Sequence, residues 1–140
     1  TLTSMIVLPM LPMINAGSVT PAAPCASPVA CCHLEGSQVQ DFRLDFEKHA
    51  RQEWPKEACG VIVDGKYWRC RNIADDPTED FVMDPRDYAL ASLYGKVEGV
   101  VHSHPRGGTA SAVDRRSCSQ TDLPWYIWSM PDEKWITIKP

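Results

Sequence analysis

The sequence predicts a mixed α/β domain, in which helices flank a mixed sheet. Residues 41–53 are rich in helix formers and end before Pro55, which predicts a first helix. The β-branched run at 59–63 is followed by Asp64-Gly65, a dipeptide that is typical of tight hairpin turns. Helical and strand-like patterns then alternate to residue 140, as expected for helices that pack on a sheet.

The remaining elements follow from local signals. Asp84-Pro85 predicts an N-cap with proline at the first helical position, and the helix is expected to stop at Gly95. Gly107-Gly108 predicts a loop. Trp125, Trp128 and Trp135 lie on short predicted strands and are expected in the core, with a binding surface as the alternative. The predicted strands are 59–63, 66–72, 81–83, 97–103, 124–129 and 135–138, and the third predicted helix is 111–120.

Length and charge limit the classes of protein that fit. The chain has 140 residues, which suits one domain. The net charge of -4 argues against a nucleic-acid-binding protein, which would usually present a basic face. The sequence has no apolar run of roughly 18 residues or more, so no transmembrane segment is predicted.

The N-terminal part differs in composition from the rest. The first 42 residues contain no Lys or Arg, so the basic start of a secretory signal is missing. We therefore expect residues 1–40 to be a flexible Pro/Ala/Cys-rich segment and 41–140 to be the folded domain. A divergent export or lipidation signal is the alternative for the first segment.

The cysteines do not form a recognisable framework. There is no CxxC pair, and Cys59, Cys70 and Cys118 lie within apolar or helical patterns. These are expected to be reduced, buried thiols. Six cysteines are an even number, so disulfides remain open from counting alone.

The motif that indicates chemistry is His102-Ser103-His104-Pro105. Two histidines at positions i and i+2 of a strand point to the same face, so both imidazoles can reach one metal ion. Asp114 follows on a predicted helix. Two imidazoles and one carboxylate are the ligands of a catalytic zinc site, which keeps a fourth position open for water. Water bound at such a site ionises near neutral pH.

Two further residues complete a predicted hydrolytic site. Glu57 lies just before the first predicted strand and is the candidate proton shuttle between water and the leaving amine. Ser111 is the candidate hydrogen-bond donor to the oxyanion. Each signal alone has an ordinary structural explanation, since an HxH pair is often a packing feature and S-x-x-D is also a helix N-cap pattern. Together and in this order the three signals are far more specific.

These residues resemble the JAMM (MPN+) metalloprotease family, whose pattern is a glutamate, H-[S/T]-H-P and S-x-x-D. The matching residues are Glu57, His102-Ser103-His104-Pro105 and Ser111-Ala112-Val113-Asp114. The resemblance implies a deaminase-like α/β/α sandwich and one Zn²⁺ per chain held by His102, His104 and Asp114. It also implies Glu57 as general base and Ser111 as stabiliser of the tetrahedral intermediate. The segment 105–110 is one residue shorter than in the family pattern, a difference that glycines can absorb.

The wider sequence also resembles the tail assembly protein K family of long-tailed phages, across roughly 41–140. The resemblance rests on the segments 55–63, 70–72 and 114–118, on Phe81, and on 123–127. Relatives of that type often carry an NlpC-like cysteine peptidase domain. The 140 residues leave no room for one, so we do not expect that activity here.

The main expectation is therefore a zinc metallopeptidase or isopeptidase-like hydrolase, in which metal-activated water attacks an amide of a peptide or protein substrate. It would act in phage tail assembly or on cell-wall peptides, with other tail proteins as further partners, in the host cytoplasm or in the virion tail. The alternative is a non-catalytic tail assembly factor with a structural zinc site. A zinc deaminase would require a P-C-x-x-C arrangement, which the sequence lacks.

Overall fold

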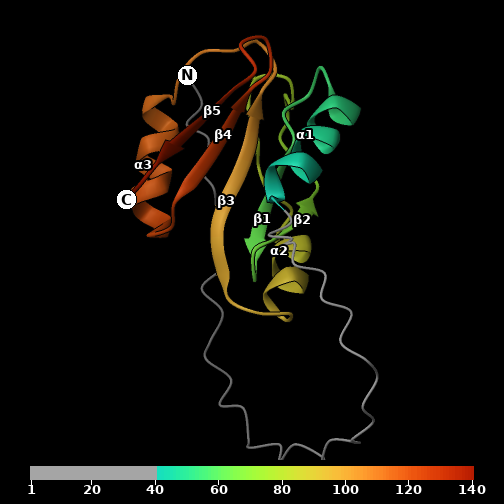
Figure 1. The fold of residues 1–140 in the computed structure, drawn as a ribbon, viewed down its shortest axis with the longest axis vertical. Coiled ribbons are helices and arrows are strands. Elements are labelled where there is room, and N and C mark those ends of the chain that lie inside the picture. The colour runs from blue at the N-terminus through green and yellow to red at the C-terminus, as the bar shows by residue number, and fades with distance from the viewer. Residues whose placement is uncertain (1–40) are drawn as a thin grey trace, which may run out of the picture.

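A five-stranded sheet forms the centre of residues 41–140, the part of the chain that the computed structural model describes (Figure 1). The predicted flexible segment 1–40 lies outside the described residues. The spatial order of the strands is β2-β1-β3-β4-β5. The central pair β3–β4 is parallel and the other pairs are antiparallel, so the sheet is mixed as predicted. The strands are β1 (Cys59–Val63), β2 (Lys66–Cys70), β3 (Val97–His104), β4 (Trp125–Ser129) and β5 (Lys134–Ile138).

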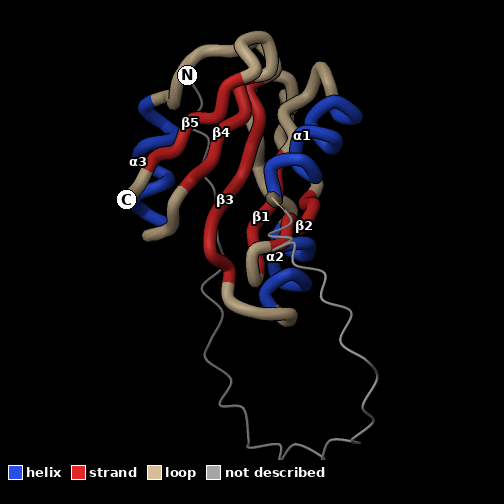
Figure 2. The backbone as a smooth tube through the Cα atoms, viewed as in Figure 1, coloured by secondary structure: helices blue, strands red, loops and turns tan. Residues whose placement is uncertain are grey.

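In the described part of the chain, three helices cover the two faces of the sheet (Figure 2). Helix α1 packs on one face with Phe46 and Ala50. The other two helices pack on the opposite face, where Ala91 and Cys118 join the larger of the two hydrophobic clusters. The result is an α/β/α sandwich, which confirms the predicted fold class. The helices are α1 (Phe42–Glu53), α2 (Pro85–Ser92) and α3 (Ala112–Thr121).

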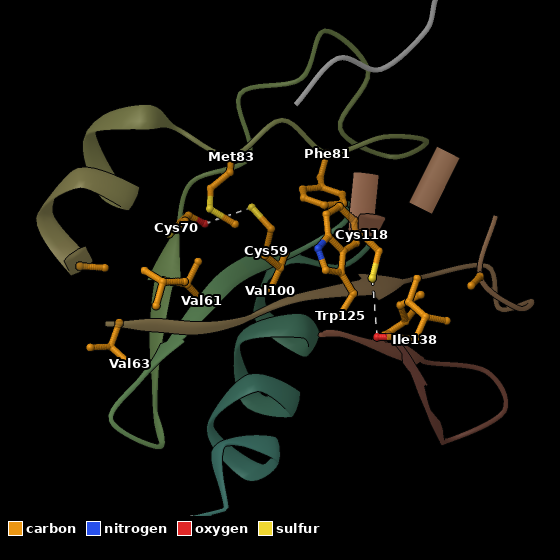
Figure 3. Packing of buried hydrophobic residues seen from close by; sticks show 14 residues of the cluster. Cys59, Val61, Val63, Cys70, Phe81, Met83, Val100, Cys118, Trp125 and Ile138 are labelled. Carbon is orange, nitrogen blue, oxygen red and sulfur yellow. Dashed lines mark hydrogen bonds between the residues drawn. The ribbon is translucent and has the colours of Figure 1, made fainter. Parts of the chain in front are cut away.

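Strand alternation explains how the two hydrophobic clusters are separated. Successive side chains of a strand point to opposite faces. In β4, Trp125 and Ile127 therefore face the cluster under α2 and α3, whereas Trp128 faces α1. Figure 3 shows Trp125 beside Phe81 and Cys118 in the first of these clusters. The prediction that Trp125 and Trp128 belong to the core is confirmed, and Trp135 is partly buried against the second cluster.

The predicted hairpin turn and the predicted start of the second helix are confirmed, whereas that helix ends at Ser92, before the predicted stop at Gly95. Asp64 and Gly65 connect β1 to β2 with φ of 50° and 73°, the left-handed region that a tight hairpin turn requires. Asp84 caps α2 through a 2.9 Å hydrogen bond donated by the Arg86 amide, and Pro85 is the first helical residue. Cys59, Cys70 and Cys118 are free and buried, as expected for small hydrophobic thiols.

One predicted strand is absent. Residues 81–83 do not form a strand but make a single β-bridge, between Met83 and Asn72. The predicted strand 66–72 also ends earlier, at Cys70. The reason lies in Asn72, whose side-chain oxygen accepts hydrogen bonds from the Ala74 and Val82 amides. A side chain that takes backbone donors in this way replaces the ladder of a regular strand pair.

Among residues 41–140, no helix is long and apolar enough to cross a membrane.

Candidate metal centre

The metal-ligand group consists of His102, His104 and Asp114. The two histidines lie on the same face of β3, near its C-terminal end, and Asp114 lies in the first turn of α3. The imidazole Nε2 atoms are 3.2 Å apart. Asp114 Oδ1 lies 3.2 Å from His102 Nε2, and Asp114 Oδ2 lies 3.3 Å from His104 Nε2. Taking one ligand atom from each residue, the three atoms all lie within 4.8 Å of one another.

The geometry and the donor chemistry fit a zinc ion. With Zn–N bonds of about 2.0–2.1 Å, neighbouring ligands of a tetrahedral ion are about 3.3 Å apart. The donor spacings of 3.2–3.3 Å match this value. His102 is completely buried, and within residues 41–140 its Nδ1 atom has no hydrogen-bond partner. Within these residues the ring therefore makes its polar contacts through Nε2, the atom that faces His104 and Asp114. The residues can hold a metal, and zinc as its identity remains a prediction.

Burial and hydrogen bonding set the charges of these donors. Burial lowers the pKa of His102, which favours the neutral imidazole that a metal requires. Burial alone would raise the pKa of Asp114. Hydrogen bonds from both imidazoles and from the Ser111 amide outweigh it and hold that pKa well below its usual range. His102 therefore presents a neutral nitrogen and Asp114 an anionic oxygen, two kinds of donor that zinc accepts.

Aromatic side chains fix the orientation of the buried histidine. The Phe81 ring stacks on the His102 imidazole with a centroid distance of 4.5 Å and an interplanar angle of 27°. Trp125 meets the same imidazole edge-on at 5.6 Å. Sequence reasoning did not assign either ring to the site, because their approach to His102 depends on tertiary structure and leaves no local signal.

The structure brings Glu57 to the same cavity as the metal-ligand group. This cavity has a volume of about 390 Å³, and its lining includes Glu57, His104, Ser111 and Asp114. Glu57 is 8% exposed. Burial, together with the negative charges of Asp114 and two further carboxylates, raises the pKa of Glu57 to about 9. A cation at the metal-ligand group would oppose this shift, because it favours the ionised carboxylate. The role of Glu57 as proton shuttle stays a prediction.

Ser111 also lies at the cavity, where it caps α3. Its Oγ accepts a 3.0 Å hydrogen bond from the Asp114 amide, and Asp114 Oδ2 accepts a 2.9 Å bond from the Ser111 amide. This reciprocal capping box fixes the carboxylate at the helix N-terminus. Gly107 and Gly108, with φ of 84° and 96°, turn the short loop that precedes it. The oxyanion role of Ser111 also stays a prediction.

Ser103 joins β3 to the segment that carries Glu57. Its Oγ accepts a 2.9 Å hydrogen bond from the Ala58 amide, and its own amide donates to the Ala58 carbonyl at 3.0 Å. Both residues are buried. The serine between the two histidines therefore holds the residue next to Glu57, on the face of the strand opposite the metal-ligand group.

Replacing Ser103 with alanine is expected to lower the free energy of unfolding by about 1–3 kcal/mol, because the buried Ala58 amide loses its partner. Urea denaturation followed by circular dichroism measures this change. Ser119→Ala is the control, since Ser119 is exposed on α3 and should change little. Equal effects of the two substitutions would contradict a structural role for the Ser103 hydroxyl.

Comparison with known proteins places this site in a family. A model of prokaryotic homologs of the JAB domain matches residues 40–136. Tail tip assembly protein K of Escherichia phage N15 is 43% identical over 97 residues, which are 66% of this chain and 40% of that protein. Its counterpart from Escherichia phage lambda is 44% identical over 46 residues, which are 32% of this chain and 23% of that protein. The chain thus spans less than half the length of these relatives.

A solved structure of a bacterial protein has a similar fold. The solution structure of protein DSY2949 from Desulfitobacterium hafniense superposes with a TM-score of 0.57 and 29% sequence identity, covering 69% of this chain and 76% of that one. The family model spans most of the described residues, and it includes all three members of the metal-ligand group. The chain belongs to the family of prokaryotic homologs of the JAB domain, which confirms the resemblance to JAMM (MPN+) domains seen in its sequence.

Proposed function

We propose that the chain is a zinc-dependent hydrolase domain that cleaves amide bonds in a peptide or protein. The observation that carries this proposal is the convergence of His102, His104 and Asp114 beside a cavity that Glu57 and Ser111 also line. A zinc ion held there would supply Lewis acidity and lower the pKa of a water molecule. Family membership supports the proposal, because the JAB family includes hydrolases.

The side chains of the cavity have distinct roles in this proposal. Glu57 accepts a proton from the attacking water and later delivers it to the departing amine. The Ser111 hydroxyl donates a hydrogen bond to the oxygen on which negative charge develops as the carbonyl is attacked. Phe81 and Trp125 hold the His102 ring and exclude water from its buried side.

The biological setting is proposed from the relatives. The N15 and lambda proteins are tail tip assembly proteins, so we propose that this chain acts in phage tail assembly or on cell-wall peptides. Other tail proteins are then its partners, in the host cytoplasm during assembly or in the virion tail.

Glu57→Gln is expected to remove amide hydrolysis without removing zinc. Glutamine keeps the size of the side chain but cannot carry the proton, so the cleavage rate should fall roughly 100- to 10,000-fold. The zinc-loaded 140-residue chain is incubated with a library of linear and isopeptide-linked peptides, and new termini are identified by mass spectrometry. Zinc content is measured on the same samples.

Two outcomes would contradict the enzymatic proposal. Equal cleavage by wild type and Glu57→Gln would exclude Glu57 as the proton shuttle. A wild type that binds zinc but cleaves nothing would favour the alternative function.

The alternative is a tail assembly factor in which zinc only stabilises the fold. The capping box favours this non-catalytic function, since Ser111 and Asp114 both have a structural role as the N-terminal cap of α3. An N15 protein K whose matching part is replaced by residues 40–136 distinguishes the two. If this chimaera supports tail assembly equally well with Glu57→Gln, assembly does not depend on catalysis.

A further inference from the structure

The side chain of Asn72 is a hydrogen-bonding centre beside the cavity. Its Nδ2 donates to the Glu57 carbonyl at 2.9 Å and to the Asp80 carbonyl at 3.0 Å, with the Pro77 carbonyl farther away at 3.4 Å. Its Oδ1 accepts from the Ala74 amide at 3.0 Å and from the Val82 amide at 3.1 Å. The backbone of Glu57 and the two neighbours of Phe81 thus meet at one amide group.

Only an amide of this length can make all of these bonds. A carboxamide has two N–H donors and an oxygen with two lone pairs, and the four shorter contacts use every one of them. Aspartate has the same shape but no N–H group, so its carboxylate would face two carbonyl oxygens. Alanine would leave the two carbonyls and two amides without this partner.

The bonds of Asn72 lead to two parts of the site. On one side they hold the Glu57 carbonyl, while the Glu57 amide donates to the Pro77 carbonyl at 2.7 Å. On the other side they hold Asp80 and Val82, the two neighbours of Phe81, whose ring stacks on His102. Asn72 itself is neither a member of the metal-ligand group nor part of the lining of the cavity beside it.

We propose that Asn72 is a positioning residue that sets Glu57 and Phe81 relative to the metal-ligand group. It does so by tying the backbone before β1 to the loop of residues 73–82. That Glu57 and His102 act in hydrolysis rests on the proposed function, but the link through Asn72 exists whether or not the chain is an enzyme.

Asn72→Asp tests the proposal in the full chain by nuclear magnetic resonance. Loss of the two donors to the Glu57 and Asp80 carbonyls should loosen the loop and raise the hydrogen-exchange rate of the Glu57 amide about ten-fold. In Asn72→Ala, which also removes the acceptor, the rates of the Ala74 and Val82 amides should rise as well. Amides of β4 and β5 should keep their rates. The ring protons of His102 should also shift, because the ring current of the stacked Phe81 is lost from above the imidazole.

Two further variants make this readout specific. Gln52→Glu is the matched control, since it also converts an amide into a carboxylate but uses only its oxygen, as acceptor from Arg69. It should leave the His102 signals unchanged. In a chain that carries Phe81→Leu, Asn72→Asp should produce no further ring-current shift at His102, because the two residues act through the same contact. Asn72→Ala, which adds no charge, should reproduce the Asn72→Asp shifts.

The proposal is overturned if the His102 signals do not move, or if exchange rises equally over the whole sheet or the variants unfold globally. Unchanged His102 signals would mean that Asn72 does not position the site. A uniform rise in exchange or global unfolding would mean that Asn72 only stabilises the whole fold. The measurements use the metal-free chain, so failure of wild type to bind zinc would refute the proposed function and leave this test intact.

Discussion

Replacing Asp114 with asparagine is expected to remove tight zinc binding while the chain keeps its fold. The carboxylate supplies the only anionic donor of the metal-ligand group, and its two oxygens lie 3.2 and 3.3 Å from the two imidazole nitrogens. An amide oxygen is neutral and a weaker ligand. Because losing a group that merely supports a ligand costs roughly 10- to 100-fold in affinity, losing the ligand itself should exceed this loss.

The affinity is measured by titration against a competing chelator, and the fold by circular dichroism. The amide oxygen introduced by Asp114→Asn can still accept the hydrogen bond from the Ser111 amide, so the start of α3 should remain ordered. Asp122→Asn is the matched control, because it makes the same change at the exposed C-terminal end of that helix. Unchanged zinc affinity in Asp114→Asn would exclude this carboxylate as a ligand.

The features that the sequence predicted correctly are those set by residues adjacent to one another in the chain. The Asp64-Gly65 turn and the Asp84-Pro85 helix start each require a backbone conformation that few residue types favour, so the signal is local and strong. The common face of His102 and His104 likewise follows from strand geometry alone. Asp114 was found in the same way, because the motif that starts α3 also fixes its carboxylate at the helix N-terminus.

Other features could not be predicted because they depend on contacts between distant segments. The predicted 81–83 strand was wrong, since the apolar residues Phe81 to Met83 do not reveal that the Asn72 side chain would accept the hydrogen bond of the Val82 amide. The stacking of Phe81 on His102 depends on the same loop. Glu57 was named from its local pattern and the family resemblance. Its position at the cavity follows from the pairing of β1 with β3, which no local signal specifies.

Trp125→Ala is expected to lower the free energy of unfolding by about 3–5 kcal/mol, which is typical for truncating a buried aromatic residue. This loss is larger than the one expected for Ser103→Ala. The side chain is fully buried at the start of β4, in the cluster that α2 and α3 cover. Its indole nitrogen also donates a 2.9 Å hydrogen bond to Thr121 Oγ1 at the end of α3. Chemical denaturation followed by far-ultraviolet circular dichroism measures the loss. Leu93→Ala is the control, because Leu93 is 80% exposed and should change stability by less than about 0.5 kcal/mol.

The same substitution should also weaken metal binding, because the Trp125 ring packs against two rings of the site. Its centroid lies 5.6 Å from that of His102, in an edge-on arrangement, and 5.8 Å from that of Phe81. Without the indole the imidazole can rotate away from the position in which Nε2 faces its partners. Zinc affinity should therefore fall under conditions where the variant remains folded, whereas Leu93→Ala should bind zinc as wild type does. A Trp125→Ala chain that loses stability but keeps wild-type zinc affinity would show that Phe81 and the strand itself suffice to orient His102.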